Sequence, residues 1–141
     1  MATAKQAAAK NLCVVTGTQR HHQRSYVESY KKIMEGLIGE ITGGTVYWNQ
    51  NMLWYRDRQP GWNDCEYMIK DWVNWKWLSG DHIVEQHVHN IDVFTWFSGL
   101  KPVKAVGFGP RHRRITGDQY DNFSVDSQWK MVSICIVCAA R

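Results

Sequence analysis

Residues 78–97 read LSGDHIVEQHVHNIDVFTWF, and this stretch decides how the rest of the chain is interpreted. Its apolar residues predict a helix over 81–97 that is buried nearly all round. Side chains three, four and seven residues apart lie on one face of a helix. One stripe of this helix therefore carries two imidazoles, two carboxylates and an indole, from His82, Glu85, His89, Asp92 and Trp96.

Charged and imidazole groups on a buried helix are costly unless they meet partners, a metal or a substrate. A hydrogen-bonded network within the core is one interpretation of the stripe, and a catalytic site is the other. Zinc is a third, because His82, Glu85, His87 and His89 include zinc-competent ligands. However, His87 points away from the stripe, and the two-His-plus-Glu spacing of zinc proteases is absent. We predict no metal site.

The elements on either side of this helix alternate between helix and strand. Upstream, apolar residues at helical spacing predict a helix over 23–37, followed by a strand over 40–50. Gly99 and Pro102 end the central helix. Downstream, we expect a strand over 103–108, a polar loop over 109–121 and the beginning of a further strand over 123–127.

A long segment, residues 51–71, lacks clear periodicity and is predicted to be a loop. It is rich in aromatic and cationic side chains, and long loops of this kind often carry function. Four of its aromatic residues, or of those just after it, are Trp54, Tyr55, Trp75 and Trp77, and such side chains suit both protein cores and clefts in which a sugar stacks. For each one singly, core packing is at least as good an explanation.

The first residues look like the middle of a larger unit. Residues 2–10 are predicted to form the end of a helix. Residues 12–16 are predicted to form a short buried strand, which ends at Gly17. A helix that feeds directly into a buried strand is typical of a βαβ unit, here without its first strand. We therefore interpret residues 1–17 as part of an incomplete βαβ unit.

The last residues, 128–141, change abruptly in character. Cys135 and Cys138 form a Cys-x-x-Cys pair, a weak signal for metal or redox chemistry within a β-like run. A shift of reading frame is our hypothesis. Deleting one T from TTC ACA GTG GAA, which encodes Phe-Thr-Val-Glu, yields the Ser-Gln-Trp-Lys of residues 127–130. After this Glu, the other frame continues with Asp or Asn and then with Gly, as in a hairpin turn. On this hypothesis the two cysteines have no selected function.

Bulk properties exclude few classes of protein. The chain has 141 residues, a formal net charge of +4 and four cysteines without disulfide spacing, Cys13 and Cys65 being the other two. Its basic residues are scattered, which does not favour a nucleic-acid partner. No apolar run predicts a membrane span. The unpaired thiols indicate a reduced compartment.

Several stretches together resemble the glucose–fructose oxidoreductase/inositol dehydrogenase (Gfo/Idh/MocA) family. The family signature has small residues, a carboxylate, three residues, His, two residues and Asp, which here falls on Ser79-Gly80, Glu85, His89 and Asp92. NLCVVTGTQRHHQRSY (residues 11–26) is similar to the family's strand and loop after the cofactor-proximal helix. Residues 58–92 are similar to one bacterial branch that often carries twin-arginine export signals. The resemblance covers about residues 10–127.

The resemblance implies a fold and a set of roles. The fold is α/β (α+β), a two-layer substrate-binding domain over 18–127 with an open, mostly antiparallel sheet and helices on one face. Residues 1–17 would be the remnant of a Rossmann dinucleotide-binding domain. His89 would take the proton of a substrate hydroxyl, and Glu85 would hold hydroxyls or tune His89. Arg20 would lie near the nicotinamide or the substrate, and His21 stands where a second Arg is expected. The remaining substrate-binding candidates are His82 and Asp92 with the four aromatic residues.

The family's Gly-rich dinucleotide turn and Glu-Lys-Pro segment do not occur in this sequence. We therefore predict a fragment of a bacterial NAD(P)-dependent sugar or polyol oxidoreductase, inactive as given, which used NAD or NADP when intact and binds neither tightly alone. An NAD-dependent glycosidase of the same family, a stand-alone carbohydrate-binding module and a zinc hydrolase are the alternatives. The resemblance implies a homo-oligomer through the sheet face. The location would be cytoplasmic, or periplasmic if a twin-arginine signal preceded this chain.

Overall fold

The computed structural model describes residues 2–15, 17–129 and 132–140, and the side chains as far as Trp129. The helices and 3-10 turns are, in chain order, α1 (Ala2–Ala9), η1 (Gln19–His22), α2 (Arg24–Met34), α3 (Asp64–Lys70), η2 (Trp72–Asn74), α4 (Lys76–Ser79), α5 (Asp81–Glu85) and α6 (Val88–Ser98). The strands are β1 (Gly43–Gln50), β2 (Pro102–Phe108), β3 (Asn122–Trp129) and β4 (Val132–Ala140). Within the described ranges, no helix has both the length and the apolar character that crossing a membrane requires.

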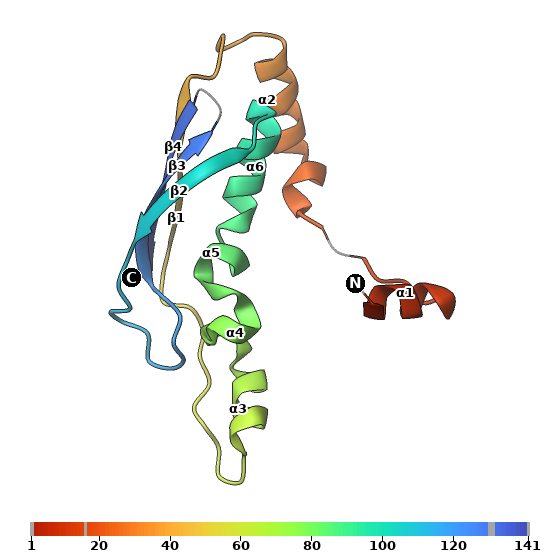
Figure 1. Cartoon of the computed structure of the whole chain (residues 1–141), viewed down its shortest axis with the longest axis vertical. Helices are drawn as coiled ribbons and strands as arrows, with labels where there is room; N and C mark the ends of the chain where they lie inside the picture. The colour runs from red at the N-terminus through yellow and green to blue at the C-terminus, as the bar shows by residue number, and fades with distance from the viewer. Residues whose placement is uncertain (1, 16, 130–131, 141) are drawn as a thin grey trace.

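The four strands form a single sheet in the order β1-β4-β3-β2. β4 runs parallel to β1, whereas the β4–β3 and β3–β2 pairs are antiparallel. Helices α4, α5 and α6 form a column along one side of the sheet, and α1 stands apart from both layers (Figure 1). The predicted two-layer architecture, with a mostly antiparallel sheet and helices on one face, is confirmed.

The core lies between the sheet and α6. Alternate residues of β1 are more and less exposed, so Val46 and Trp48 face the helices while Tyr47 faces outward. Trp129, 1% exposed, is the centre of the apolar cluster, and its ring lies 5.2 Å from that of Phe94. The other residues packed on Trp129 are Val46, Ile91, Leu100 and Val125. Burial of each large apolar side chain in such a cluster contributes about 2 kcal/mol, which fixes α6 against the sheet.

The buried strand predicted at residues 12–16 is wrong for its described part, 12–15. These residues have no regular structure, and Leu12, Val14 and Val15 are 61%, 62% and 90% exposed. A strand needs a neighbour for its backbone hydrogen bonds, and the described strands pair only with one another. Thr16 lies outside the described residues.

The loop predicted over 51–71 contains a helix that the sequence analysis missed. α3 begins after Asn63, whose side-chain oxygen accepts a hydrogen bond from the backbone N–H of Glu66 at 2.9 Å. Acidic residues in the first turn and Lys70 in the last turn fit the helix dipole. These capping signals were present in the sequence, but the apolar spacing alone did not reveal them.

The helix predicted over 81–97 is interrupted. The backbone N–H of His87 donates to the carbonyl of His82, five residues back, at 3.2 Å. This wide turn separates α5 from α6 and rotates the two halves of the predicted stripe relative to each other. The helix is also not buried nearly all round, because Val84 and Val88 are 54% and 38% exposed.

The remaining elements agree with the predicted ranges. α2, β1 and β2 lie within or closely match the helix and strands expected at 23–37, 40–50 and 103–108. β3 continues two residues past the predicted Ser127, and β4 fills the position between β1 and β3. Residues 130, 131 and 141 of the predicted frameshifted tail lie outside the described residues, so the frame hypothesis stays a prediction.

Candidate functional site

His89 lies at the start of α6, beside the inward face of β1. Its ring centroid is 5.9 Å from that of Trp48, with the ring planes inclined by 32°. Its Nδ1 is buried and has no hydrogen-bond partner in the part of the chain that the structure describes. A catalytic imidazole is commonly oriented by a hydrogen bond at one nitrogen. Here the packing against Trp48 takes the place of such a bond in setting the ring.

Arg20 comes from η1, far away in the sequence, and reaches the same place. Its guanidinium carbon lies 5.4 Å from the centroid of Trp48 and 5.3 Å from that of Tyr26. Nη1 of Arg20 donates a hydrogen bond to Oδ1 of Asn90, and Nδ2 of Asn90 donates to the carbonyl of Tyr47 at 2.6 Å. Asn90 therefore joins three elements, η1, α6 and β1, next to His89.

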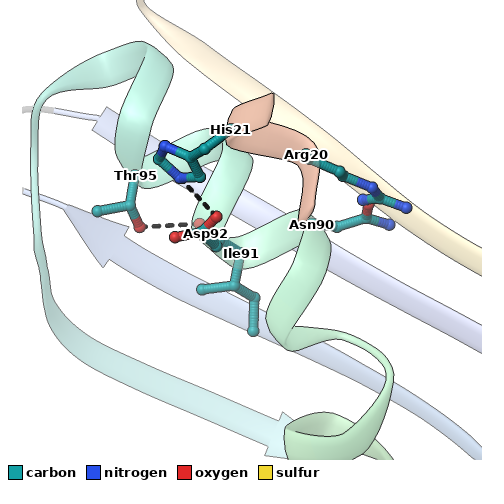
Figure 2. Close-up of polar contacts among 6 residues, drawn as sticks. All are labelled: Arg20, His21, Asn90, Ile91, Asp92 and Thr95. Atoms are coloured by element: carbon teal, nitrogen blue, oxygen red, sulfur yellow. Dashed lines mark hydrogen bonds and ion pairs between the residues drawn. The ribbon is translucent and has the colours of Figure 1, made fainter. Parts of the chain in front are cut away.

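His21, the neighbour of Arg20, pairs with Asp92. Its Nε2 lies 2.8 Å from Oδ2 of Asp92, and its ring stacks on Trp96 with centroids 4.3 Å apart. Tyr30 stacks on the same indole at 4.8 Å. Figure 2 shows how the adjacent residues of η1 reach α6, Arg20 toward Asn90 and His21 toward Asp92. Two side-chain pairs thus hold η1 on the first turns of α6.

Among the described residues, no hydrogen bond or ion pair joins Glu85 to His89. Oε2 of Glu85 accepts a hydrogen bond from Nε2 of Gln86, so the carboxylate is held by its own neighbour at the break between α5 and α6. The break is the physical reason that the stripe predicted for a continuous helix is divided. Glu85 remains a proposal as a substrate ligand or as a group that tunes His89.

His82 belongs to a second, fully buried cluster. Its Nδ1 lies 3.4 Å from Nη2 of Arg114, and its ring is 5.7 Å from that of His87. Both imidazoles are 0% exposed. Burial lowers the pKa of His82 from its usual 6.5 to about 4, and the positive charge of Arg114 acts in the same direction. Burial alone lowers the pKa of His87 to about 4.

A hydrogen-bond network joins this cluster to the loop before β3. Asp71, 0% exposed, accepts from Nδ2 of Asn74 at 2.8 Å, from the backbone N–H of Arg56 at 2.9 Å and from the hydroxyl of Thr116 at 2.8 Å. Oδ1 of Asn74 accepts from Nη1 of Arg114 at 2.9 Å. Of the residues predicted to share one stripe of the central helix, only His82 contacts this network through a hydrogen bond that the described residues show.

The four aromatic residues predicted to wall a sugar site lie on the loop before α3 and on the segment from η2 to α4. Trp54 and Tyr55, 45% and 38% exposed, lie on the loop before α3, and Trp54 meets Trp72 at 6.5 Å. Trp75 packs against Tyr67 at 6.1 Å. Trp77 on α4 is 65% exposed. Among the described residues, no ring contact joins any of the four to His89, and their place in a sugar site stays a prediction.

Three residues of the site were not singled out as site residues from the sequence. Trp48 could have been found from the alternation of β1, which turns every second residue inward. Asn90 and His21 carried no signal of their own, because their roles depend on the docking of η1 against α6. His21 was noted only as standing in place of an expected arginine.

The described residues do not form a cradle for a dinucleotide or a set of metal ligands. A pyrophosphate cradle needs a Gly-rich turn that opens a helix. The glycines around residue 43 instead lead into β1. Among the residues that the structure describes, no three His, Cys, Asp or Glu side chains gather where they could hold a metal ion.

No protein-family model matches the sequence, and no curated protein matches it. Solved structures do share its fold. Myo-inositol 2-dehydrogenase from Lactobacillus plantarum is 20% identical over 93% of this chain, with a TM-score of 0.65. Aldose-aldose oxidoreductase from Caulobacter crescentus, complexed with glycerol, is 15% identical over 98%, with a TM-score of 0.69. Scyllo-inositol dehydrogenase from Lactobacillus casei, with bound NAD(H) and scyllo-inositol, is 19% identical over 95%, with a TM-score of 0.60.

This chain spans only part of the length of these structures. The alignment covers 36% of the L. plantarum enzyme, 37% of the C. crescentus enzyme and 37% of the L. casei enzyme. The chain therefore has the fold found in one part of sugar and polyol oxidoreductases.

Proposed function

We propose that this chain is the substrate-binding part of a nicotinamide-dependent oxidoreductase of the Gfo/Idh/MocA family that acts on a sugar or polyol hydroxyl. The observation that carries the proposal is the cluster of His89, Arg20 and Asp92 around Trp48 and η1. His89 and Asp92 belong to the family signature, and the resemblance of residues 11–26 gives Arg20 a place near the substrate or the nicotinamide. A fold shared with inositol dehydrogenases supports the same assignment.

The chemistry assigned to this chain is the proton part of alcohol oxidation. When a secondary hydroxyl becomes a carbonyl, its proton leaves to a base while its carbon loses a hydride. His89 is the base, because one ring nitrogen of a neutral imidazole carries a lone pair that can accept this proton. The hydride acceptor, NAD or NADP, would have to be held by protein beyond the described residues. By itself the chain is expected to bind polyols weakly and not to catalyse their oxidation.

Titration of the chain, labelled with ¹⁵N-histidine, with myo-inositol tests this assignment. We expect the ring nitrogens of His89 to shift in a saturable manner, while those of exposed His112 stay unchanged. His89→Gln assigns the signal, and His112→Gln is its matched control. A titration in which His89 does not respond, although the chain is folded, contradicts the proposal.

A stand-alone carbohydrate-binding module is the second candidate. The observation that favours it is the exposure of two indoles, since Trp54 is 45% and Trp77 is 65% exposed. Sugars stack on exposed aromatic rings of this kind. This module would bind sugars through Trp54 and Trp77, independently of His89. Sugar binding that survives His89→Gln and is lost in the Trp54→Ala, Trp77→Ala double variant would favour it.

A further inference from the structure

His21 and Asp92 form a carboxylate–imidazole pair of the type that orients a histidine for work on a substrate. An ionised carboxylate can only accept hydrogen bonds. The 2.8 Å contact between Asp92 and His21 therefore places the proton of the neutral imidazole on Nε2. Nδ1 is then left with a lone pair, as an acceptor, and it makes no hydrogen bond to the part of the chain that the structure describes.

The surroundings of His21 hold the ring but do not bury it. The imidazole lies nearly flat on Trp96, at an interplanar angle of 21°, and Tyr30 stacks on the same indole. The side chains of His21 and Asp92 are 34% and 28% exposed, so solvent and small solutes reach the pair. One side-chain contact would be enough to attach η1 to α6, and the hydrogen bond from Arg20 to Asn90 already provides one. Attachment of η1 is therefore not a sufficient reason for the His21–Asp92 pair.

The pair also lies close to His89. Residues three positions apart are neighbours on the surface of a helix. His89 and Asp92 stand in this relation on α6. One polyol molecule is large enough to place a hydroxyl at each of two groups that are neighbours in this way.

Resting on the function proposed above, we propose that His21, oriented by Asp92, is a second substrate-binding imidazole whose Nδ1 accepts a hydrogen bond from another hydroxyl of the polyol that His89 binds. Asp92 is then a positioning residue that acts through His21. The site selects substrates with at least two suitably placed hydroxyls, and a monohydric alcohol of the same ring size satisfies only His89.

The test uses the complete chain labelled with ¹⁵N-histidine and two probes, myo-inositol and cyclohexanol. Without a probe, His21 is expected in the Nε2–H tautomer. Asp92→Asn keeps an acceptor and should retain that tautomer, whereas Asp92→Leu should give a mixture of tautomers. With myo-inositol, Nδ1 of His21 should shift more than Nε2, and exposed His22 should not respond. His21→Gln and Asp92→Leu should weaken the binding of myo-inositol about three- to tenfold, which is the effect of one neutral hydrogen bond.

The outcomes separate this inference from the function on which it rests. A response of His89 to myo-inositol without any response of His21 overturns the role of His21 and leaves the proposed function standing. Equal responses of His21 to cyclohexanol and to myo-inositol, or an unchanged tautomer in Asp92→Leu, also overturn it. If neither histidine responds to myo-inositol, both proposals fail.

Discussion

The ring centroids of Trp48 and His89 lie 5.9 Å apart, and the guanidinium of Arg20 lies 5.4 Å from the centroid of the same indole. A single side chain of β1 thereby touches two groups that come from segments far apart in the sequence. Since Nδ1 of His89 has no described hydrogen-bond partner, Trp48 is the contact that sets the orientation of the imidazole.

Trp48→Ala should therefore disturb both stability and site. Truncation of a partly buried tryptophan should lower the free energy of unfolding by about 3 kcal/mol. It should also abolish the response of His89 to myo-inositol, because the ring contact with Trp48 is then lost. Urea unfolding and the histidine titration measure the two effects.

The matched control for this substitution is Trp77→Ala, at an indole that is 65% exposed. A surface substitution of this kind should change the free energy of unfolding by less than about 0.5 kcal/mol. An unaltered His89 response in Trp48→Ala would refute the role given to Trp48.

Asp71 should be among the most sensitive positions for stability. Asp71→Ala leaves the Asn74 amide, the Thr116 hydroxyl and the backbone N–H of Arg56 without their acceptor in a buried place. Each such donor costs about 1–3 kcal/mol, partly recovered where water enters, so we expect a total loss of at least about 3 kcal/mol in urea unfolding. Asp57→Ala, on the exposed loop before α3, is the control, and equal effects of the two substitutions would contradict this account of the network.

Acid should destabilise the fold through His82 and His87. Their pKa values lie at about 4 in the folded chain and near 6.5 when unfolded, so the unfolded state binds protons first as the pH falls. Stability is then full above about pH 6.5 and falls between pH 6.5 and 4, by up to about 1.4 kcal/mol per pH unit for each histidine.

Urea unfolding measured at several pH values tests this dependence. His87→Phe should make the slope between pH 6.5 and 4 shallower, whereas His112→Gln, at an exposed histidine, should leave it unchanged. If stability does not depend on pH over this range in the parent chain, the two imidazoles are not buried in the neutral form.

The outer face of the sheet should associate with a second copy of the chain. β2 is exposed along its whole length, and Val106 and Phe108 are 56% and 69% exposed. Exposed apolar residues that lie together on a sheet face favour association. Sedimentation should therefore detect dimers or larger species, which the Val106→Lys, Phe108→Lys double variant should dissociate. Lys101→Ala, just before β2, is the control. A parent chain that stays monomeric up to the highest concentration at which it dissolves would contradict this prediction.

Local patterns predicted much of the fold correctly. The alternation in 43–50 and the helical spacing in 24–34 predicted β1 and α2, because one face of each element is shielded by the other layer. The strand at 12–15 failed because β-like composition does not supply a pairing partner. α3 was missed because it is short and is set by its caps rather than by apolar spacing.

The site was predictable only in part. The signature identified His89 and Asp92, but a periodic pattern could not reveal the wide turn at His87 that separates Glu85 and His82 from them. Trp48, Asn90 and His21 became part of the site through contacts between η1, α6 and β1. Such long-range docking leaves no local trace in a sequence.

The central claim, that this chain is the substrate-binding part of a nicotinamide-dependent oxidoreductase, is tested most directly by reading the encoding DNA from well upstream of Met1 to well past Arg141. We predict an upstream coding stretch with a Gly-rich dinucleotide turn and a Glu-Lys-Pro segment, and a base missing near codon 127. Its repair should restore a Glu-Asp-Gly or Glu-Asn-Gly turn. DNA without an upstream dinucleotide-binding unit, and with an intact frame through Ser127, would contradict the claim and make the stand-alone binding module the better account.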